Sequence, residues 1–180
     1  MTHDLEQTIA LLSRTPKVLD ALLRDMPDAW TRTNEGDGTW SPAAVVAHLN
    51  HTERNNWITR ARVILESGEA RVFDPLDGVG GTKELERQPL PQMLDAFARL
   101  RADSVRQLRA LELQPADLDR RGRHPKFGVV TLSQLLATWA AHDLTHLHQI
   151  SRVMAYQSRE DVGPWVKYLG VLHCTGHGEK

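Results

Sequence analysis

Apolar residues recur at helical spacing along most of the chain, with polar residues between them. The pattern covers roughly residues 5–26, 42–66, 91–112 and 132–156, and in each stretch it leaves one polar face. Amphipathic helices of this length bury their apolar faces by packing side by side. We therefore predict an all-α fold, a four-helix bundle.

Proline and capping residues predict where these helices begin and end. Pro16 interrupts the first stretch, so we expect a break there, with Thr15 capping the helix that follows. Ser41 and Pro42 are typical of a helix start, and Thr131 is expected to cap the last long helix. A short extra helix is predicted to begin at Pro164.

Three long connectors separate the predicted helices, at residues 28–40, 72–90 and 113–130. The segment 72–90 is too irregular to predict a packed element, and loops of this length are often functional or mobile. Short extended stretches are expected at the ends of 113–130. Connectors this long permit a crossover in place of simple up-and-down topology.

Length and composition favour one domain over residues 1–180, with a flexible tail at about 172–180. Cys174 is the single cysteine, so no disulfide can form within the chain. Neither a signal peptide nor an apolar stretch of membrane-spanning length is evident. A cytoplasmic location is therefore expected.

The charge balance excludes one class of partner, and a small-molecule substrate is the partner expected. Lys and Arg number 22 against 23 Asp and Glu, a formal net charge of −1. This balance argues against a nucleic-acid surface, which needs clustered positive charge. The basic run at 120–124 is interpreted as a solvated loop. We expect neither nucleic acid nor a membrane as partner, and a homodimer is compatible with the sequence.

Histidines on two of the predicted helices suggest a metal site. His142 and His146 are four residues apart, so their imidazoles share one helical face and can reach one ion. The pair alone is more typical of two ordinary histidines at a core edge than of a metal site. On the 42–66 helix, His48 falls at the edge of the apolar stripe and is the better third ligand. His51 lies further out, as a rim residue or an alternative ligand, and His148 is predicted to be a surface residue.

Other polar residues near these histidines allow two interpretations. Glu53 and Asn56 point toward the apolar side, where they either support a metal ligand or form a structural hydrogen bond. Asp143 either orients an imidazole or stabilises the helix interior. The terminal His173-Cys174-x-x-His177 has donor types at suggestive spacing, but termini are commonly disordered.

Two segments carry a resemblance to a known family, WSPAAVVAHLNHTERNNW at 40–57 and HPKFGVVTLSQLLATWAAHDLTHLHQISRVM at 124–154. With the H-D-x-x-H-x-x-Q-I pattern that starts at His142, the chain resembles the DinB-like family of bacterial proteins. The resemblance implies a four-helix bundle with a crossover, and a metal triad of His48, His142 and His146. The wider superfamily includes metal-dependent thiol transferases and isomerases that use bacillithiol, mycothiol or glutathione.

Three neutral imidazoles leave a coordination position open for water or substrate. Zinc or nickel is the expected ion, although imidazole also suits copper and iron. Such an ion acidifies a bound water and deprotonates a bound thiol. We predict a metal-dependent enzyme for a small molecule, of thiol-linked transferase or isomerase type, with Trp139, Gln149 and residues 69–90 lining its pocket. The alternatives are a metal-dependent hydrolase and a non-catalytic metal-binding protein of the stress response.

Overall fold

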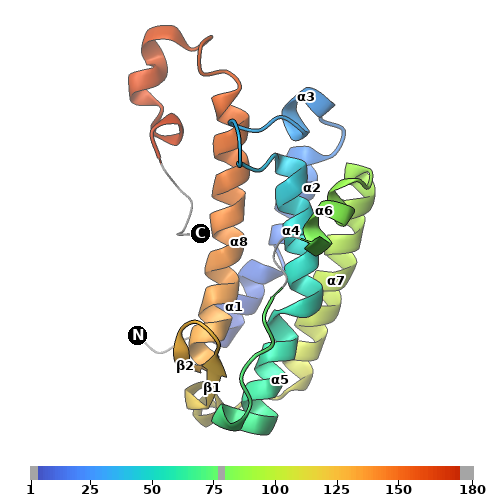
Figure 1. Ribbon diagram of the computed structural model, residues 1–180, viewed down its shortest axis with the longest axis vertical. Coiled ribbons are helices and arrows are strands. Elements are labelled where there is room, and N and C mark those ends of the chain that lie inside the picture. Colours follow the sequence, from blue (N-terminus) through green and yellow to red (C-terminus); the bar gives the residue numbers. More distant parts are fainter. Residues whose placement is uncertain (1–3, 77–79, 175–180) are drawn as a thin grey trace.

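Long helical segments lie side by side along the axis of the molecule (Figure 1). The computed structural model describes residues 4–76 and 80–174. The first bundle segment comprises two helices in succession, as does the second, whereas the third and fourth are single helices. In chain order these helices are α1 (Leu5–Leu12) with α2 (Thr15–Leu23), α4 (Pro42–Asn55) with α5 (Trp57–Ser67), α7 (Leu90–Ala110), and α8 (Leu132–Tyr156).

The topology of the bundle is not up-and-down. The segment formed by α1 and α2 packs against α7 and α8, and the segment formed by α4 and α5 packs against the same two helices from the other side. The first and second segments are therefore diagonal neighbours. The connection between them, which includes the short helix α3 (Asp28–Thr31), crosses one end of the bundle (Figure 1). The predicted four-helix bundle with a crossover is confirmed.

The predicted helix starts at Ser41 and Thr131 are confirmed. The Ser41 hydroxyl accepts a hydrogen bond from the Ala44 amide at 3.2 Å. Thr131 and Gln134 form a capping box, each side chain accepting a bond from the other residue's amide. The prediction for Thr15 was wrong, because Thr15 lies inside the first turn of α2 and its hydroxyl donates to Asp143 instead.

The second bundle segment is interrupted, where the sequence predicted one helix over 42–66. Asn56 adopts φ −111° and ψ −71°, and this separates α4 from α5. The hydrogen bonds on either side persist, since the Asn56 amide donates to Thr52 and the Asn56 carbonyl accepts from Arg60. Neither Gly nor Pro marks the break, and the buried side-chain oxygen of Asn56 has no hydrogen-bond partner among the described residues.

The connector 72–90 contains more structure than predicted. Helix α6 (Gly80–Glu86) forms within it and packs against α4. The 3₁₀ turn η1 (Gly68–Ala70) follows α5 and precedes this connector. Near the start of the connector, the Phe73 amide donates to the Arg123 carbonyl at 2.9 Å. This bond attaches the segment after α5 to the part of the chain around Arg123.

The connector 113–130 forms a 3₁₀ turn and then a hairpin, so the extended stretch expected at its second end is present, whereas a 3₁₀ turn forms near its first end. Its first part is η2 (Pro115–Asp119). The antiparallel strands β1 (Arg121–His124) and β2 (Gly128–Thr131) follow. A side chain at Gly122 would meet Ile64 at 2.6 Å, so the hairpin packs this closely on α5 only with glycine there.

The chain after α8 forms 3₁₀ turns beside the opposite end of the bundle from the hairpin (Figure 1). They are η3 (Gly163–Tyr168) and η4 (Gly170–Leu172). The short helix predicted from Pro164 is therefore 3₁₀, and it begins one residue earlier. Of the tail expected at 172–180, residues 175–180 lie outside the described part of the chain. Within the described ranges, no helix combines the length and the apolar character that crossing a membrane requires.

Two apolar clusters fill the bundle, one in each half of its length. One gathers Leu12, Ile64 and Trp139 with their neighbours, and the other gathers Leu19, Leu49 and Phe97 with theirs. In each of the four bundle segments, a buried polar residue separates the residues of one cluster from those of the other along the sequence. These residues are Thr15, Glu53, Arg101 and Asp143. The candidate metal centre lies at this polar layer.

Candidate metal centre

Three histidines from two helices converge at the middle of the bundle. Helix α4 carries His48, and α8 carries His142 and His146. The Nε2 atom of His142 lies 3.2 Å from that of His48 and 3.2 Å from that of His146. His146 is buried, and the other two side chains are partly buried. The structure thus brings together the three residues that the sequence singled out.

The spacing of the three nitrogens suits a metal ion. Zinc binds imidazole nitrogen at about 2.0–2.1 Å in tetrahedral geometry, which places two ligand nitrogens about 3.3–3.4 Å apart. The separations of 3.2 Å here are close to that value. Among residues 4–76 and 80–174, the group that could hold an ion consists of these histidines, with no fourth Cys, His or carboxylate donor. The site is therefore of the open type.

The surroundings of the triad favour neutral imidazoles, which is the form that binds a metal. Burial, then the charges of His146 and His51, lower the pKa of His48 from 6.5 to about 3. Burial, then the charges of His146, His48 and Arg101, lower the pKa of His142 to about 2. Both imidazoles are therefore uncharged at neutral pH, with a proton on one ring nitrogen and a free lone pair on the other.

The metal-free protein is expected to lose stability as the pH falls below about 6.5. His48 and His142 have lower pKa values folded than unfolded, so below that pH the unfolded chain binds more protons. Each histidine then costs up to about 1.4 kcal/mol of unfolding free energy per pH unit until its folded pKa is reached. Urea unfolding between about pH 7 and pH 5 measures this slope. His48→Gln should have a shallower slope, and an unchanged slope would contradict the assignment.

Gln149 fixes the orientation of one imidazole. Its side-chain oxygen lies 2.8 Å from Nδ1 of His146, and it accepts the proton there. That bond selects the tautomer in which Nε2 of His146 has a free lone pair toward the other two rings. Within the described part of the chain, the buried Nδ1 atoms of His48 and His142 have no such partner. Gln149, predicted to line a pocket, is 6% exposed.

Replacing Gln149 with leucine is expected to weaken metal binding by about 10- to 100-fold, because outer hydrogen bonds of metal ligands contribute that much. Competition with a chromophoric chelator measures the affinity. The matched control is Gln107→Leu on α7, whose side chain bonds to Asp103 and Arg62. Equal affinities for the two variants would show that the bond to His146 does not tune the site.

Tryptophans enclose the triad on two sides. The Trp40 ring lies 4.8 Å from the His48 ring, and the Trp57 ring contacts His142 edge-on at 5.1 Å. Trp57 in turn stacks on Trp139 at 5.7 Å. Trp139 is 1% exposed, so this residue, also predicted to line a pocket, lies in the core. The tryptophan rings exclude water from the imidazoles and contribute to their depressed pKa values.

A buried arginine holds the acidic residues of the polar layer. Arg101 on α7 donates to both carboxylate oxygens of Glu53 at 2.9 Å. It also donates to Asp143 at 2.5 and 2.9 Å, and Asp143 accepts from the Thr15 hydroxyl. Burial alone would lower the pKa of Arg101, but Asp143 and Glu53 outweigh burial and raise it. Glu53 and Asp143 are thus structural ion-pair partners rather than ligands or bases.

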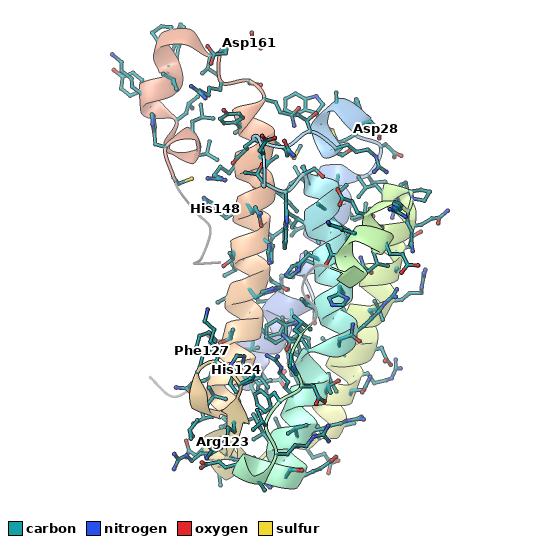
Figure 2. All side chains as sticks on the ribbon, in the orientation of Figure 1. Asp28, Arg123, His124, Phe127, His148 and Asp161 are labelled. Atoms are coloured by element: carbon teal, nitrogen blue, oxygen red, sulfur yellow. The ribbon has the colours of Figure 1, made fainter. Side chains whose placement is uncertain are left out.

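The other residues considered from the sequence lie apart from the triad. His51 is buried one turn after His48 and lines a separate cavity. His148 is exposed on α8, where its Nε2 lies 3.1 Å from the Cys174 sulfur (Figure 2). His173 contacts the Val166 carbonyl, and His177 lies outside the described residues. Arg123 and His124 belong to the hairpin, at the opposite end of the molecule from Asp28 (Figure 2).

Comparison with known protein families shows which family the chain belongs to. The model of the DinB superfamily matches residues 11–150. The chain belongs to the DinB superfamily. The matched region includes all three histidines of the triad, all of α4, and α8 as far as Ile150. The resemblance stated from the sequence is confirmed, whereas no curated protein matches the chain.

A solved DinB-like structure shares the fold. YfiT from Bacillus subtilis is 22% identical to this chain, covers 90% of both chains and superposes with a TM-score of 0.74. It is described as a probable metal-dependent hydrolase with an unusual four-helix bundle topology. The agreement extends to the crossover arrangement of the bundle.

Sequence reasoning missed Arg101 and the two tryptophans at the triad. Arg101 follows Phe97 by four residues and precedes Leu108 by seven, so it falls on the buried face of α7. A charged residue at a core position of a helix is the signal that could have revealed it. Trp40 lies outside the regular helices, where periodicity gives no indication of burial.

Proposed function

We propose that this protein is a metal-dependent enzyme that acts on a small molecule at the histidine triad. The observation that carries the proposal is the convergence of three Nε2 atoms with no fourth protein donor among the described residues. A structural zinc site is usually closed by four protein ligands, whereas a catalytic site keeps a position for water or substrate. A non-catalytic metal-binding role is therefore less well supported.

The side chains around the triad have distinct tasks in this proposal. His48, His142 and His146 would hold the ion through Nε2, and Gln149 keeps His146 in the required tautomer. Arg101 holds both Glu53 and Asp143 in ion pairs, so neither carboxylate competes for the open position. An ion at the triad would supply Lewis-acid chemistry, acidifying a thiol or water that enters that position.

We further propose that the ligand at the open position is a low-molecular-weight thiol, and that the reaction is of transferase or isomerase type. A thiol that binds the ion loses its proton outright and needs no general base. This fits a triad whose neighbouring carboxylates are both paired with Arg101. The thiol proton would leave to solvent. In a transfer, the sulfur would bond to an electrophilic carbon as that carbon's bond to its leaving group breaks, and the leaving group would depart with the electron pair; in an isomerisation, the sulfur would add to a double bond and leave again after rotation.

Hydrolysis is the second candidate, and the described function of YfiT favours it. An acidified water would replace the thiol as nucleophile, with the same residues in the same tasks. Zinc and nickel both suit three imidazoles, so both remain candidates for the ion. We also propose a cytoplasmic location, where small thiols are kept reduced.

Cobalt substitution distinguishes these reactions. A thiolate bound to Co²⁺ gives an intense near-ultraviolet charge-transfer band, which water does not. We expect this band to appear when the Co²⁺-loaded protein is titrated with glutathione, bacillithiol or mycothiol at up to millimolar concentration. The His48→Ala variant is the control, because it lacks one ligand. If no thiol produces the band, thiol transfer is excluded and hydrolysis takes its place.

A further inference from the structure

A cavity of about 250 Å³ opens beside the second bundle segment, on the side of the segment that follows η1. Its walls come from the end of α4, from the first turns of α5 and from residues 73–76. The lining residues are His51, Asn55, Thr59, Arg60, Val63, Phe73, Asp74, Pro75 and Leu76. Pockets for whole small ligands are usually about 300–1000 Å³, so this cavity suits one end of a ligand.

The cavity combines an apolar wall with one accessible cation. Val63 and Phe73 are buried and form the wall. Arg60 is half-buried, and its guanidinium lies 5.3 Å from the centre of the Phe73 ring. The guanidinium donates a hydrogen bond to the Asp74 backbone carbonyl at 3.4 Å, whereas the Asp74 carboxylate pairs with Arg71 at 3.0 Å. The Asp74 carboxylate also acts on Arg60 through its charge, but no ion pair joins the two in the described part of the chain, so the Arg60 guanidinium keeps N–H donors for an anion.

A buried histidine adds a hydrogen-bond donor at the end of the cavity nearest the triad. The Asn55 side-chain amide lies 3.4 Å from Nδ1 of His51 and donates to it, so the ring proton is on Nε2. Nε2 of His51 is buried, and it has no partner within residues 4–76 and 80–174. Burying such a donor without an acceptor is costly, so an acceptor supplied by a ligand would offset that cost.

The position of this cavity relates it to the triad. His51 follows His48 by one helical turn, so the two side chains are neighbours along α4. Arg60 lies further along the same segment, roughly 18 Å from His48 if the helix were continuous. A molecule that reached from one to the other would be elongated, with its reacting group at the His48 end.

We propose that this cavity binds the carboxylate end of an elongated substrate, with Arg60 as counter-ion, while His51 donates to an acceptor further along the molecule, nearer the triad. The inference rests on the proposed function, because it assigns a substrate class to the same site. The substrate is then an elongated organic acid, whose alkyl or aryl part contacts Val63 and Phe73. The carboxylate would be held away from the triad, which leaves the open position to the reacting group.

Calorimetric titration of the zinc-loaded protein with hexanoate, and with hexanol as its uncharged counterpart, tests the proposal. We expect saturable binding of hexanoate, weaker by at least about tenfold in Arg60→Gln, because hydrogen bonds to charged groups contribute strongly. Arg60→Lys retains the charge and should bind with intermediate affinity. Arg62→Gln is the matched control, since Arg62 is exposed on α5 and contacts Gln107.

The His142→Ala variant separates this proposal from the metal-dependent function. Hexanoate binding that survives in His142→Ala and falls in Arg60→Gln supports the carboxylate site, whatever the reaction at the triad. Binding that is lost in His142→Ala but unchanged in Arg60→Gln would mean that the carboxylate coordinates the ion, and the proposal would be wrong. Equal affinity for hexanoate and hexanol, or no binding of hexanoate at all, would also overturn it.

Discussion

Replacing His142 with alanine is expected to abolish tight metal binding. Its Nε2 atom lies between those of His48 and His146, 3.2 Å from each, so its loss leaves two nitrogens on different helices. Outer hydrogen bonds of metal ligands contribute about 10- to 100-fold to affinity, and a direct ligand should contribute more than that. Metal analysis of protein purified without a histidine tag should find about one ion per chain before the change and none after it.

The control for this experiment is His148→Ala on the same helix. His148 is exposed, so the variant should keep its metal. Full occupancy in His142→Ala would contradict the triad. Loss of metal in both variants would point to a general effect on α8 instead.

Replacing Arg101 with methionine is expected to lower the unfolding free energy by about 3–5 kcal/mol, because breaking a buried ion pair leaves uncompensated charge. In this variant two buried carboxylates, Glu53 and Asp143, lose their partner at once. Methionine replaces the aliphatic stem of the arginine side chain, so the change keeps the packing of that stem and removes the guanidinium with its charge and hydrogen bonds. Urea unfolding at neutral pH measures the change.

Arg106→Met on the same helix is the control. Arg106 pairs with Asp103 at the exposed surface, where an ion pair contributes little, and its loss should change stability by less than about 1 kcal/mol. A change in Arg101→Met as small as in the control would show that the two carboxylates are stabilised by other means. If Arg101→Met does not fold, Glu53→Gln removes a single charge and tests the same network.

The parts of this fold that the sequence predicted are those with a strong local signal. The long helices follow from apolar residues at a period of 3.6, and the starts at Ser41 and Thr131 from side chains that cap the first turn. His142 and His146 share a face because of their spacing alone. The position of His48 opposite them depended on placing it at the edge of an apolar stripe.

The parts that were not predicted depend on tertiary contacts. The hairpin strands are four residues long each, too short for an alternating pattern, and Gly122 at their base is required by contact with Ile64. The break at Asn56 has no Gly or Pro to mark it. Arg101 was not singled out because an arginine on an amphipathic helix usually reaches solvent, and its carboxylate partners lie 48 and 42 residues away.

The distribution of the three histidines along the chain has a consequence for how an ion would act on folding. His142 and His146 stay near each other in any conformation, whereas His48 is 94 residues away from His142. An unfolded chain would therefore retain at most a weak two-nitrogen site. The ion would behave as a reversible cross-link that closes a long loop, for which chain-entropy arguments give up to about 4.7 kcal/mol. Chelation should then accelerate amide hydrogen exchange first where α4 faces α8.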